Sequence, residues 1–206
     1  KKVFDLQNSS RTNFYRSIFF KGVEWSNTET SLEHGQKKSE FDEEPVLKRM
    51  KIQLEKSNVK VNYTENIDLG WASKNIQSII NQHIEGKYIA IFPFCSIKHK
   101  KKLWPYFFDL INKLKINFGN EYSIVIAPGP KEIEESKKFN TNIILNNGNS
   151  LNLIELISFI KEASYIISND TGPAHIASHL NKKGLVLFGS HTSSKKVSLG
   201  EKNIKS

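Results

Sequence analysis

The stretch that decides the fold reads Tyr165-Ile-Ile-Ser-Asn-Asp-Thr-Gly-Pro-Ala-His175 and continues to a second apolar run, Gly184-Leu-Val-Leu-Phe188. Tyr165 to Ser168 is short and mostly apolar, which is typical of a strand buried in a parallel sheet. Asp and Thr are common helix caps and Pro suits the first helical turn, so the middle of the stretch predicts a helix from Pro173 to Leu180. The whole stretch therefore predicts a strand, a helix and a further strand, which is a βαβ unit.

The same alternation extends back to about residue 86. Apolar runs predict strands at residues 88–92, 122–127 and 142–145, and helical spacing of apolar residues predicts helices at 104–118, 131–139 and 153–163. Strands that alternate with helices over short connections form a parallel sheet with right-handed crossovers. Residues 86–206 are therefore predicted to form a Rossmann-like α/β domain.

The first 85 residues are less regular. We predict strands at 3–6 and 59–63, helices at 10–20, 45–56 and 72–84, and a flexible polar loop at 27–44. So few strands make a poor independent domain. The chain also opens at Lys1 without an initiator Met, so we expect residues 1–85 to be the remnant of an N-terminal domain whose beginning lies upstream.

Composition excludes several classes of protein. In 206 residues, 38% are hydrophobic and 25% charged, which is a globular rather than a disordered composition. The sequence has no apolar run long enough to span a membrane and no recognisable signal peptide. The single cysteine, Cys95, forms no intrachain disulfide, and a cytoplasmic location is expected. The net charge of +9 indicates either an anionic partner or simply a high frequency of lysine.

The loops after the strands hold the candidate site, because ligands of an open parallel sheet bind beyond the carboxyl ends of its strands. In the loop from Asn169 to His175, free backbone N–H groups beside Gly172 can hold a phosphate oxygen with help from the helix dipole. The alternative is that Asp170 or Thr171 only caps the helix, and that His175 is only a structural hydrogen-bonding residue.

Two further loops carry charged candidates. The lysine run 98–102 follows the first strand of the domain, where one lysine can neutralise a diphosphate, although most of the run is expected to be solvated. Glu132 follows the second strand and can accept hydrogen bonds from ribose hydroxyls, or it can simply stabilise a helix dipole.

Three motifs in this order resemble glycosyltransferase family 9, the ADP-heptose:lipopolysaccharide heptosyltransferases. Lys102-Leu-Trp104-Pro105 resembles the family's Lys-x-Trp-Pro, and Ser168-Asn-Asp170-Thr-Gly172-Pro-Ala-His175-Ile-Ala177 resembles its Asn-Asp-[Ser/Thr]-Gly-x-x-His-[Leu/Ile]-Ala signature. Phe4-Asp-Leu-Gln7 with Arg11-Thr12 resembles an Asp-Leu-Gln…Arg segment of the N-terminal domain. Two departures concern the donor pocket: Pro93–Ser96 replaces a Gly-rich turn, and Ser190-His191-Thr192 replaces Pro-Thr.

The resemblance implies a GT-B architecture, in which two Rossmann-like domains face a cleft and the C-terminal one binds the nucleotide sugar. It implies heptose transfer from ADP-heptose to a lipopolysaccharide-core acceptor, without a metal or another cofactor. The implied catalytic residues are Lys102 and Asp170, which stabilise the leaving diphosphate. The implied nucleotide-sugar site comprises Ser96, Lys102, Glu132, Asp170, Thr171, Gly172 and His175. The family's general base lies early in the N-terminal domain, so none is assigned here.

The implied partners are a nucleotide sugar and an anionic, lipid-linked glycan acceptor, met by a basic protein at the inner face of the bacterial inner membrane. No nucleic-acid partner is expected, because aromatic residues are not interleaved with the lysines. The isolated fragment is expected to be inactive. The alternatives are a non-catalytic nucleotide-binding or nucleic-acid-binding module, a truncated pseudoenzyme, and a GT-B or epimerase-like enzyme that uses a UDP- or GDP-sugar.

Overall fold

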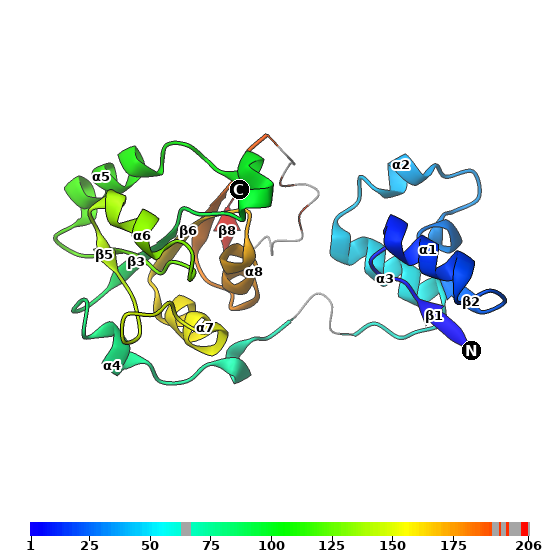
Figure 1. Cartoon of the computed structure of the whole chain (residues 1–206), viewed down its shortest axis with the longest axis horizontal. Helices are drawn as coiled ribbons and strands as arrows, with labels where there is room; N and C mark the ends of the chain where they lie inside the picture. The colour runs from blue at the N-terminus through cyan, green and yellow to red at the C-terminus, as the bar shows by residue number, and fades with distance from the viewer. Residues whose placement is uncertain (63–66, 191–193, 195–196, 198–202, 206) are drawn as a thin grey trace. The chain divides into compact units, whose positions relative to one another are not determined.

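The chain forms two compact units in a computed structural model that describes residues 1–62, 67–190, 194, 197 and 203–205. The first unit covers Lys1–Ile67, and the second covers Asp68–Ser194 together with a strand at the C-terminal end of the chain (Figure 1). Each unit has its own sheet, so each is described by itself.

The second unit is built on a six-stranded parallel sheet with the order β5-β4-β3-β6-β7-β8. All five neighbouring pairs are parallel. The strands are β3 (Tyr88–Phe92), β4 (Ser123–Ile126), β5 (Asn142–Ile143), β6 (Tyr165–Asn169), β7 (Gly184–Leu187) and β8 (Ile204–Lys205). In chain order from β3 this is 3-2-1-4-5-6, the order of dinucleotide-binding folds, which confirms the predicted Rossmann-like domain.

Helices cover both faces of this sheet, and alternate strand residues pack on opposite sides. Ala90 and Phe92 belong to one core cluster, whereas Ile89 and Ile91 belong to the other. The first cluster packs against α7 (Leu153–Glu162) and α8 (Gly172–His179), and the second against α5 (Phe107–Phe118) and η4 (Lys137–Phe139), which follows α6 (Ile133–Ser136). Strands buried on both faces have continuous apolar sequences, which is why they were predictable.

The segment before β3 contributes to the core of the second unit. It contains η2 (Gly70–Ala72) and α4 (Gln77–Ile80), and it buries Ile76, Ile80 and Ile84 in the same cluster as Phe159. Lys74 adds an ion pair to the buried Glu155 of α7, with 3.0 Å between Nζ and Oε1. The two compact units divide at residue 67, earlier in the chain than the boundary predicted at 85.

The first unit is a small α/β layer. Strands β1 (Lys2–Phe4) and β2 (Glu24–Ser26) pair in parallel and are connected through α1 (Ser10–Ile18). Ser9 and Thr12 form a capping box at the start of α1. The chain continues through η1 (Glu29–Ser31), α2 (Lys38–Phe41) and α3 (Val46–Lys56). Gln53 of α3 is buried, and its amide donates to the carbonyls of Asp5 and Ser26 at the ends of the two strands.

Several predicted elements differ in the structure. Residues 59–62 form no strand, residue 63 lies outside the described residues, and the helix expected over 72–84 is limited to α4. Residues 27–44 contain η1 and α2, and Phe41 is only 2% exposed, because this polar stretch supplies one aromatic side chain to a local core. Strands β2 and β8 were not predicted. None of the helices in the described part of the chain combines the length and hydropathy of a membrane-spanning segment.

Candidate functional site

The strand order of the second unit reverses between β3 and β6. The chain moves outward from β3 to β4 and β5, and then returns to place β6 on the other side of β3. Ligands of such sheets bind at this switch point, beyond the carboxyl ends of the two strands. The loops that leave β3 and β6 contain the Lys-x-Trp-Pro and Asn-Asp-Thr-Gly motifs, so the fold brings the two motifs together.

Asn169 ties these two loops to each other. Its side chain is fully buried, its Nδ2 donates to the carbonyl of Pro93 at 2.9 Å, and its Oδ1 accepts from the backbone N–H of Trp104 at 3.0 Å. A buried amide held at both ends fixes the position of the loop that contains Lys102. The sequence motif included Asn169, but this bridging role was not predicted.

Lys102 and Asp170 form an ion pair at the switch point. The ammonium of Lys102 lies 2.7 Å from Oδ2 of Asp170 and also donates to the Asp170 carbonyl at 3.0 Å. The Asp170 side chain is 3% exposed, whereas that of Lys102 is 27% exposed. The pair therefore has a buried carboxylate and an ammonium that solvent or a ligand can reach.

The N-terminus of α8 lies directly after Asp170. The N-cap is Thr171, but its side chain does not cap the helix: the Thr171 hydroxyl donates instead to the Asn169 carbonyl at 3.3 Å. This corrects the expectation that Asp170 or Thr171 caps α8 through its side chain, because both side chains are oriented by other partners. A methyl group placed on Gly172 would meet no atom within 4 Å. An uncapped helix start with open space beside its backbone is suited to an anion.

His175 lies one turn into α8, with Nε2 3.6 Å from Oδ1 of Asp170. Its side chain is 42% exposed. Burial lowers the pKa of His175 below its ordinary 6.5, and the charge of Lys102 lowers it further, whereas Asp170 raises it. These effects favour a neutral imidazole near pH 7, which adds no positive charge to the site.

Glu132 and Cys95 belong to the neighbouring loops after β4 and β3. Oε2 of Glu132 accepts from the backbone N–H of Gly129 at 2.9 Å, which closes the turn after β4. Burial raises the pKa of the Cys95 thiol, Glu132 raises it further, and Lys102 lowers it. No role for Cys95 was predicted, since a lone cysteine has no motif.

One further predicted site residue, Ser96, lies in the described part of the chain. Ser96 is exposed and precedes η3 (Ile97–Lys102), where its carbonyl accepts from the His99 N–H at 2.7 Å. Its hydroxyl makes no cap for η3. His191 and Thr192, where the sequence departs from the family, lie outside the described residues.

An apolar pocket of about 380 Å³ lies on the α5 side of the sheet. Trp104 is in its wall, but Lys102 and Asp170 are not. The other walls come from the loop after β3, the start of α5, and α6 with η4, and the lining residues include Phe94, Leu103, Pro105, Phe108 and Phe139.

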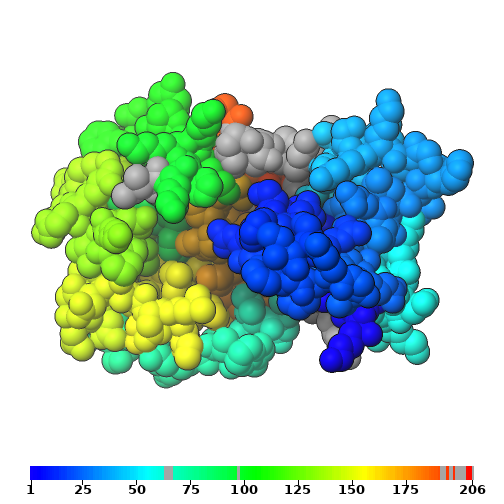
Figure 2. Space-filling view, turned by 45° about the vertical axis from the view of Figure 1, so that its right-hand side comes forward, coloured from blue at the N-terminus to red at the C-terminus, as the bar shows by residue number. Residues whose placement is uncertain are grey.

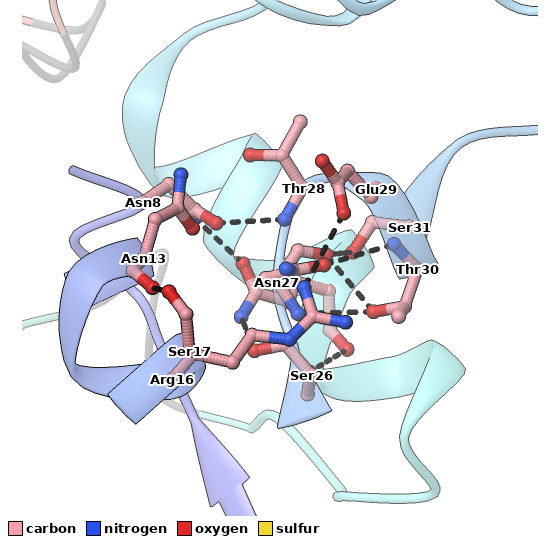
Figure 3. A network of polar contacts seen from close by, with 11 residues as sticks. Asn8, Asn13, Arg16, Ser17, Ser26, Asn27, Thr28, Glu29, Thr30 and Ser31 are labelled. Carbon is pink, nitrogen blue, oxygen red and sulfur yellow. Dashed lines mark hydrogen bonds and ion pairs between the residues drawn. The ribbon is translucent and has the colours of Figure 1, made fainter. Parts of the chain in front are cut away.

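The first unit has a polar cluster of its own around the end of β2 (Figure 3). Asn8 accepts from the Thr28 N–H at 2.7 Å, and Asn27 and Thr30 exchange hydrogen bonds. Arg16 extends from α1 to Glu29, with 3.3 Å between Nη1 and Oε2. A pocket of about 470 Å³ lies beside this pair and is lined by Asn13, Arg16, Ser17, Phe20, Lys21 and Glu29, among others.

Comparisons with solved structures return bacterial glycosyltransferases. The E. coli heptosyltransferase WaaC with ADP-2-deoxy-2-fluoro heptose is 15% identical, with a TM-score of 0.60 over 99% of this chain and 64% of that one. E. coli ADP-heptose lps heptosyltransferase II is 17% identical, with a TM-score of 0.62 over 99% and 67%. A family 9 glycosyl transferase from Veillonella parvula is 14% identical, with a TM-score of 0.64 over 93% and 53%.

These likenesses establish the fold, and the chain spans less than two thirds of the length of WaaC. A search of curated protein sequences finds no match. The sequence profile of glycosyltransferase family 9 (heptosyltransferase) matches residues 15–205, which is most of the chain. The motifs at the switch point and this match agree, and the chain belongs to glycosyltransferase family 9.

Proposed function

We propose that the second unit of this chain is the donor-binding domain of a glycosyltransferase that moves a sugar from a nucleoside diphosphate to an acceptor hydroxyl. The observation that carries the proposal is the Lys102–Asp170 pair beside the uncapped N-terminus of α8, at the switch point of a dinucleotide-binding sheet. Cationic and backbone N–H donors meet there, which is the arrangement that a diphosphate requires.

Lys102 is suited to an interaction with the diphosphate that becomes stronger during the reaction. Its ammonium has three N–H donors, of which Asp170 accepts two through its carboxylate and carbonyl oxygens. The third donor remains for a phosphate oxygen. When the bond between the sugar and the diphosphate breaks, negative charge accumulates on the diphosphate. A fixed cation and a helix N-terminus stabilise this charge more in the transition state than in the ground state, which lowers the barrier.

The same arrangement supports transfer without a metal ion. Asp170 holds Lys102 in place, and Asn169 holds the loop that contains it, so the positive charge is fixed before the donor binds. A fixed ammonium and the partial positive charge of α8 then supply what a divalent cation supplies in other nucleotide-sugar enzymes. Glu132 is proposed to bind the ribose hydroxyls through the carboxylate oxygen that does not hold Gly129.

We further propose ADP-heptose as the donor and an anionic, lipid-linked lipopolysaccharide core as the acceptor, with the protein in the cytoplasm beside the inner membrane. The E. coli WaaC structures are of that protein with ADP-2-deoxy-2-fluoro heptose and with ADP, which supports the choice of donor. The first unit is then the acceptor side, and its polar cluster around Arg16 is where acceptor groups are expected.

The test is isothermal titration calorimetry of the chain with ADP, UDP and GDP. ADP is expected to bind most tightly. Gly172→Ala tests the site most directly, and it is expected to weaken ADP binding. Its methyl group meets no protein atom but occupies the space where a diphosphate would approach the backbone. Lys102→Ala is expected to weaken ADP binding by roughly 10- to 100-fold, the contribution of a charge-assisted hydrogen bond.

Lys98→Ala is the matched control, because it removes one positive charge from the same η3 segment at an exposed position. It is expected to leave ADP binding within about twofold of the unchanged protein. If ADP bound equally well to all three variants, the diphosphate would not lie at the switch point. If UDP or GDP bound more tightly than ADP, the ADP-sugar assignment would be wrong while the site itself stood.

A further inference from the structure

A basic–aromatic patch covers the surface between β3 and the body of α5. We define it by four basic residues of η3 (Lys98, His99, Lys100 and Lys101) and three apolar residues that follow (Leu103, Tyr106 and Phe108). All four basic residues are exposed, and the three apolar side chains are 45%, 59% and 51% exposed. Figure 2 shows the green region that contains these elements at the surface of the second unit. The patch uses neither Lys102 nor Asp170.

The positive charge of the patch is not neutralised within its surroundings. Among the residues that the structure describes, Lys98, Lys100 and Lys101 form no ion pair, whereas Lys137 and Lys138 of η4 pair with Glu134 and Glu135. Three lysines without acidic partners in four residues create a local positive potential. Such a potential attracts an anionic surface at distances up to about 8 Å in physiological salt.

The apolar part of the patch is held rigidly. The Trp104 ring contacts Tyr106 and Phe107 edge-on, with ring centroids 5.4 Å apart in both pairs. Trp104 is in turn fixed through its backbone N–H by the buried Asn169. Leu103 and Phe108 line the open apolar pocket of about 380 Å³, in which Phe139 forms part of the wall. The Trp104 ring therefore supports the exposed apolar side chains beside it, which reduces the ordering that binding requires.

We propose that the basic–aromatic patch docks this protein on an anionic lipid bilayer. Lysines beside exposed aromatic and aliphatic side chains form the chemistry of an interfacial membrane contact: the ammonium groups meet anionic headgroups, and the apolar side chains enter the boundary of the acyl chains. Tyr106 suits the boundary between the headgroups and the acyl chains, because its ring is apolar and its hydroxyl is polar. The pocket beside Leu103 offers further apolar surface to the acyl chains.

A lipid surface fits the patch better than a nucleic acid does. His99 alone interrupts the lysines, and the aromatic residues Tyr106 and Phe108 follow them, so no Phe, Tyr or Trp ring alternates with a cation along the chain. Leu103 adds apolar area but has no flat face on which a base can stack. Charge complementarity and the apolar pocket together select an anionic membrane as the occupant.

Membrane docking at this position goes beyond donor binding, and it has a consequence for it. The basic segment ends at Lys101, and Lys102 begins the donor site, so a protein docked by this patch holds its donor site close to the headgroups. A lipid-linked acceptor is then delivered by diffusion in two dimensions. The docking itself requires no nucleotide, so its failure and the failure of the proposed donor site can be told apart.

The test is cosedimentation of the full chain with vesicles of phosphatidylcholine alone and with about 30% phosphatidylglycerol, an anionic content that creates a negative surface potential. Binding is expected only to the anionic vesicles. Lys98→Gln/Lys100→Gln/Lys101→Gln is expected to weaken it by roughly 100-fold, from about a factor of five per lysine. Leu103→Ser/Phe108→Ser is expected to weaken it while leaving the salt dependence unchanged, since only apolar contact is lost.

Lys37→Gln/Lys38→Gln/Lys60→Gln is the matched control, because it removes the same net charge from exposed positions of the first unit. It is expected to bind anionic vesicles as the unchanged protein does. Equal losses in the two triple variants would show attraction to net charge alone and overturn the patch. Binding to a 30-nucleotide single-stranded RNA but not to anionic vesicles would overturn the lipid assignment. The circular dichroism spectrum and thermal melt of each variant serve as the check that it is folded.

Discussion

Lys102 and Asp170 lie 68 positions apart in the sequence, and the switch point of the sheet brings them to 2.7 Å. Removing the lysine leaves a carboxylate that is 3% exposed without its cation. We expect Lys102→Met to lower the free energy of unfolding by about 2 kcal/mol, less than the 3–5 kcal/mol of a fully buried pair, because the ammonium is partly solvated. Lys102→Met/Asp170→Asn is expected to recover about half of that loss, because it also removes the buried carboxylate charge.

Urea unfolding of the four species in this double-mutant cycle measures the coupling between the two side chains. Phe108→Ser, at the start of α5, serves as a control, since its side chain is 51% exposed. If the two substitutions were additive within about 0.5 kcal/mol, Lys102 and Asp170 would not be coupled in the folded protein. The orientation of the Lys102 side chain would then have a cause other than Asp170.

His175 makes stability depend on pH in a definite direction. Its pKa in the folded chain is below the ordinary 6.5, mainly because of burial, so the unfolded chain binds the proton more tightly. The stability that this histidine contributes is complete above pH 6.5 and is lost as the pH falls toward its folded pKa. We expect the protein to lose stability between about pH 7.5 and 5.5, and His175→Gln to lose less over the same interval.

The measurement is the free energy of unfolding at both pH values, from urea titrations that follow tryptophan fluorescence. The pKa of His179 is also lowered, by burial first and then by the charge of His175, so some pH dependence is expected to remain in His175→Gln. A variant with the same pH dependence as the unchanged protein would show that the His175 proton does not distinguish the folded chain from the unfolded one.

At the residue scale, the sequence was informative where a motif was involved. Lys102 and Asp170 were predicted because each follows a buried strand in a recognisable pattern, and parallel strands bring such loops together. The bridge that Asn169 forms between the loops after β3 and β6 was not predictable. It depends on how loops after different strands pack, which the local spacing of residues does not determine.

At the scale of elements, η3 and the end of β7 are packed backbone against backbone. A methyl group added to Gly189 would overlap the carbonyl oxygen of Lys101. We expect Gly189→Ala to displace η3 and so weaken ADP binding about tenfold, although Gly189 contacts neither charge of the site. Calorimetry with ADP measures the effect. Gly172→Ala, which adds its methyl group in open space, should leave the unfolding midpoint unchanged, whereas Gly189→Ala should lower it.

Strands that are buried on both faces were the easiest elements to predict from the sequence. Strands β3, β4, β6 and β7 lie between two helical layers, so nearly all their residues are apolar and the runs stand out. Strand β2 was missed because its three residues, Glu24, Trp25 and Ser26, show no apolar run. Residues 27–44 were predicted as a flexible loop because polar side chains such as Asn27 and Ser31 dominate; in the structure these are buried and satisfied by hydrogen bonds within the turn.

At the scale of the whole molecule, the position of the division between the two units has a measurable consequence. Ile76, Ile80 and Ile84 precede β3 and are 1%, 1% and 6% exposed in the core of the second unit. We expect the fragment 68–206 to fold cooperatively and to bind ADP within about threefold of the full chain. The fragment 86–206 lacks three buried isoleucines, worth roughly 5 kcal/mol together, which is comparable to the whole stability of a small domain. It is expected to be unfolded or molten. Circular dichroism melts and calorimetry on the two fragments decide between the division at residue 67 and the boundary predicted at residue 85. A cooperative melt of 86–206 at the melting temperature of 68–206 would favour the boundary at residue 85.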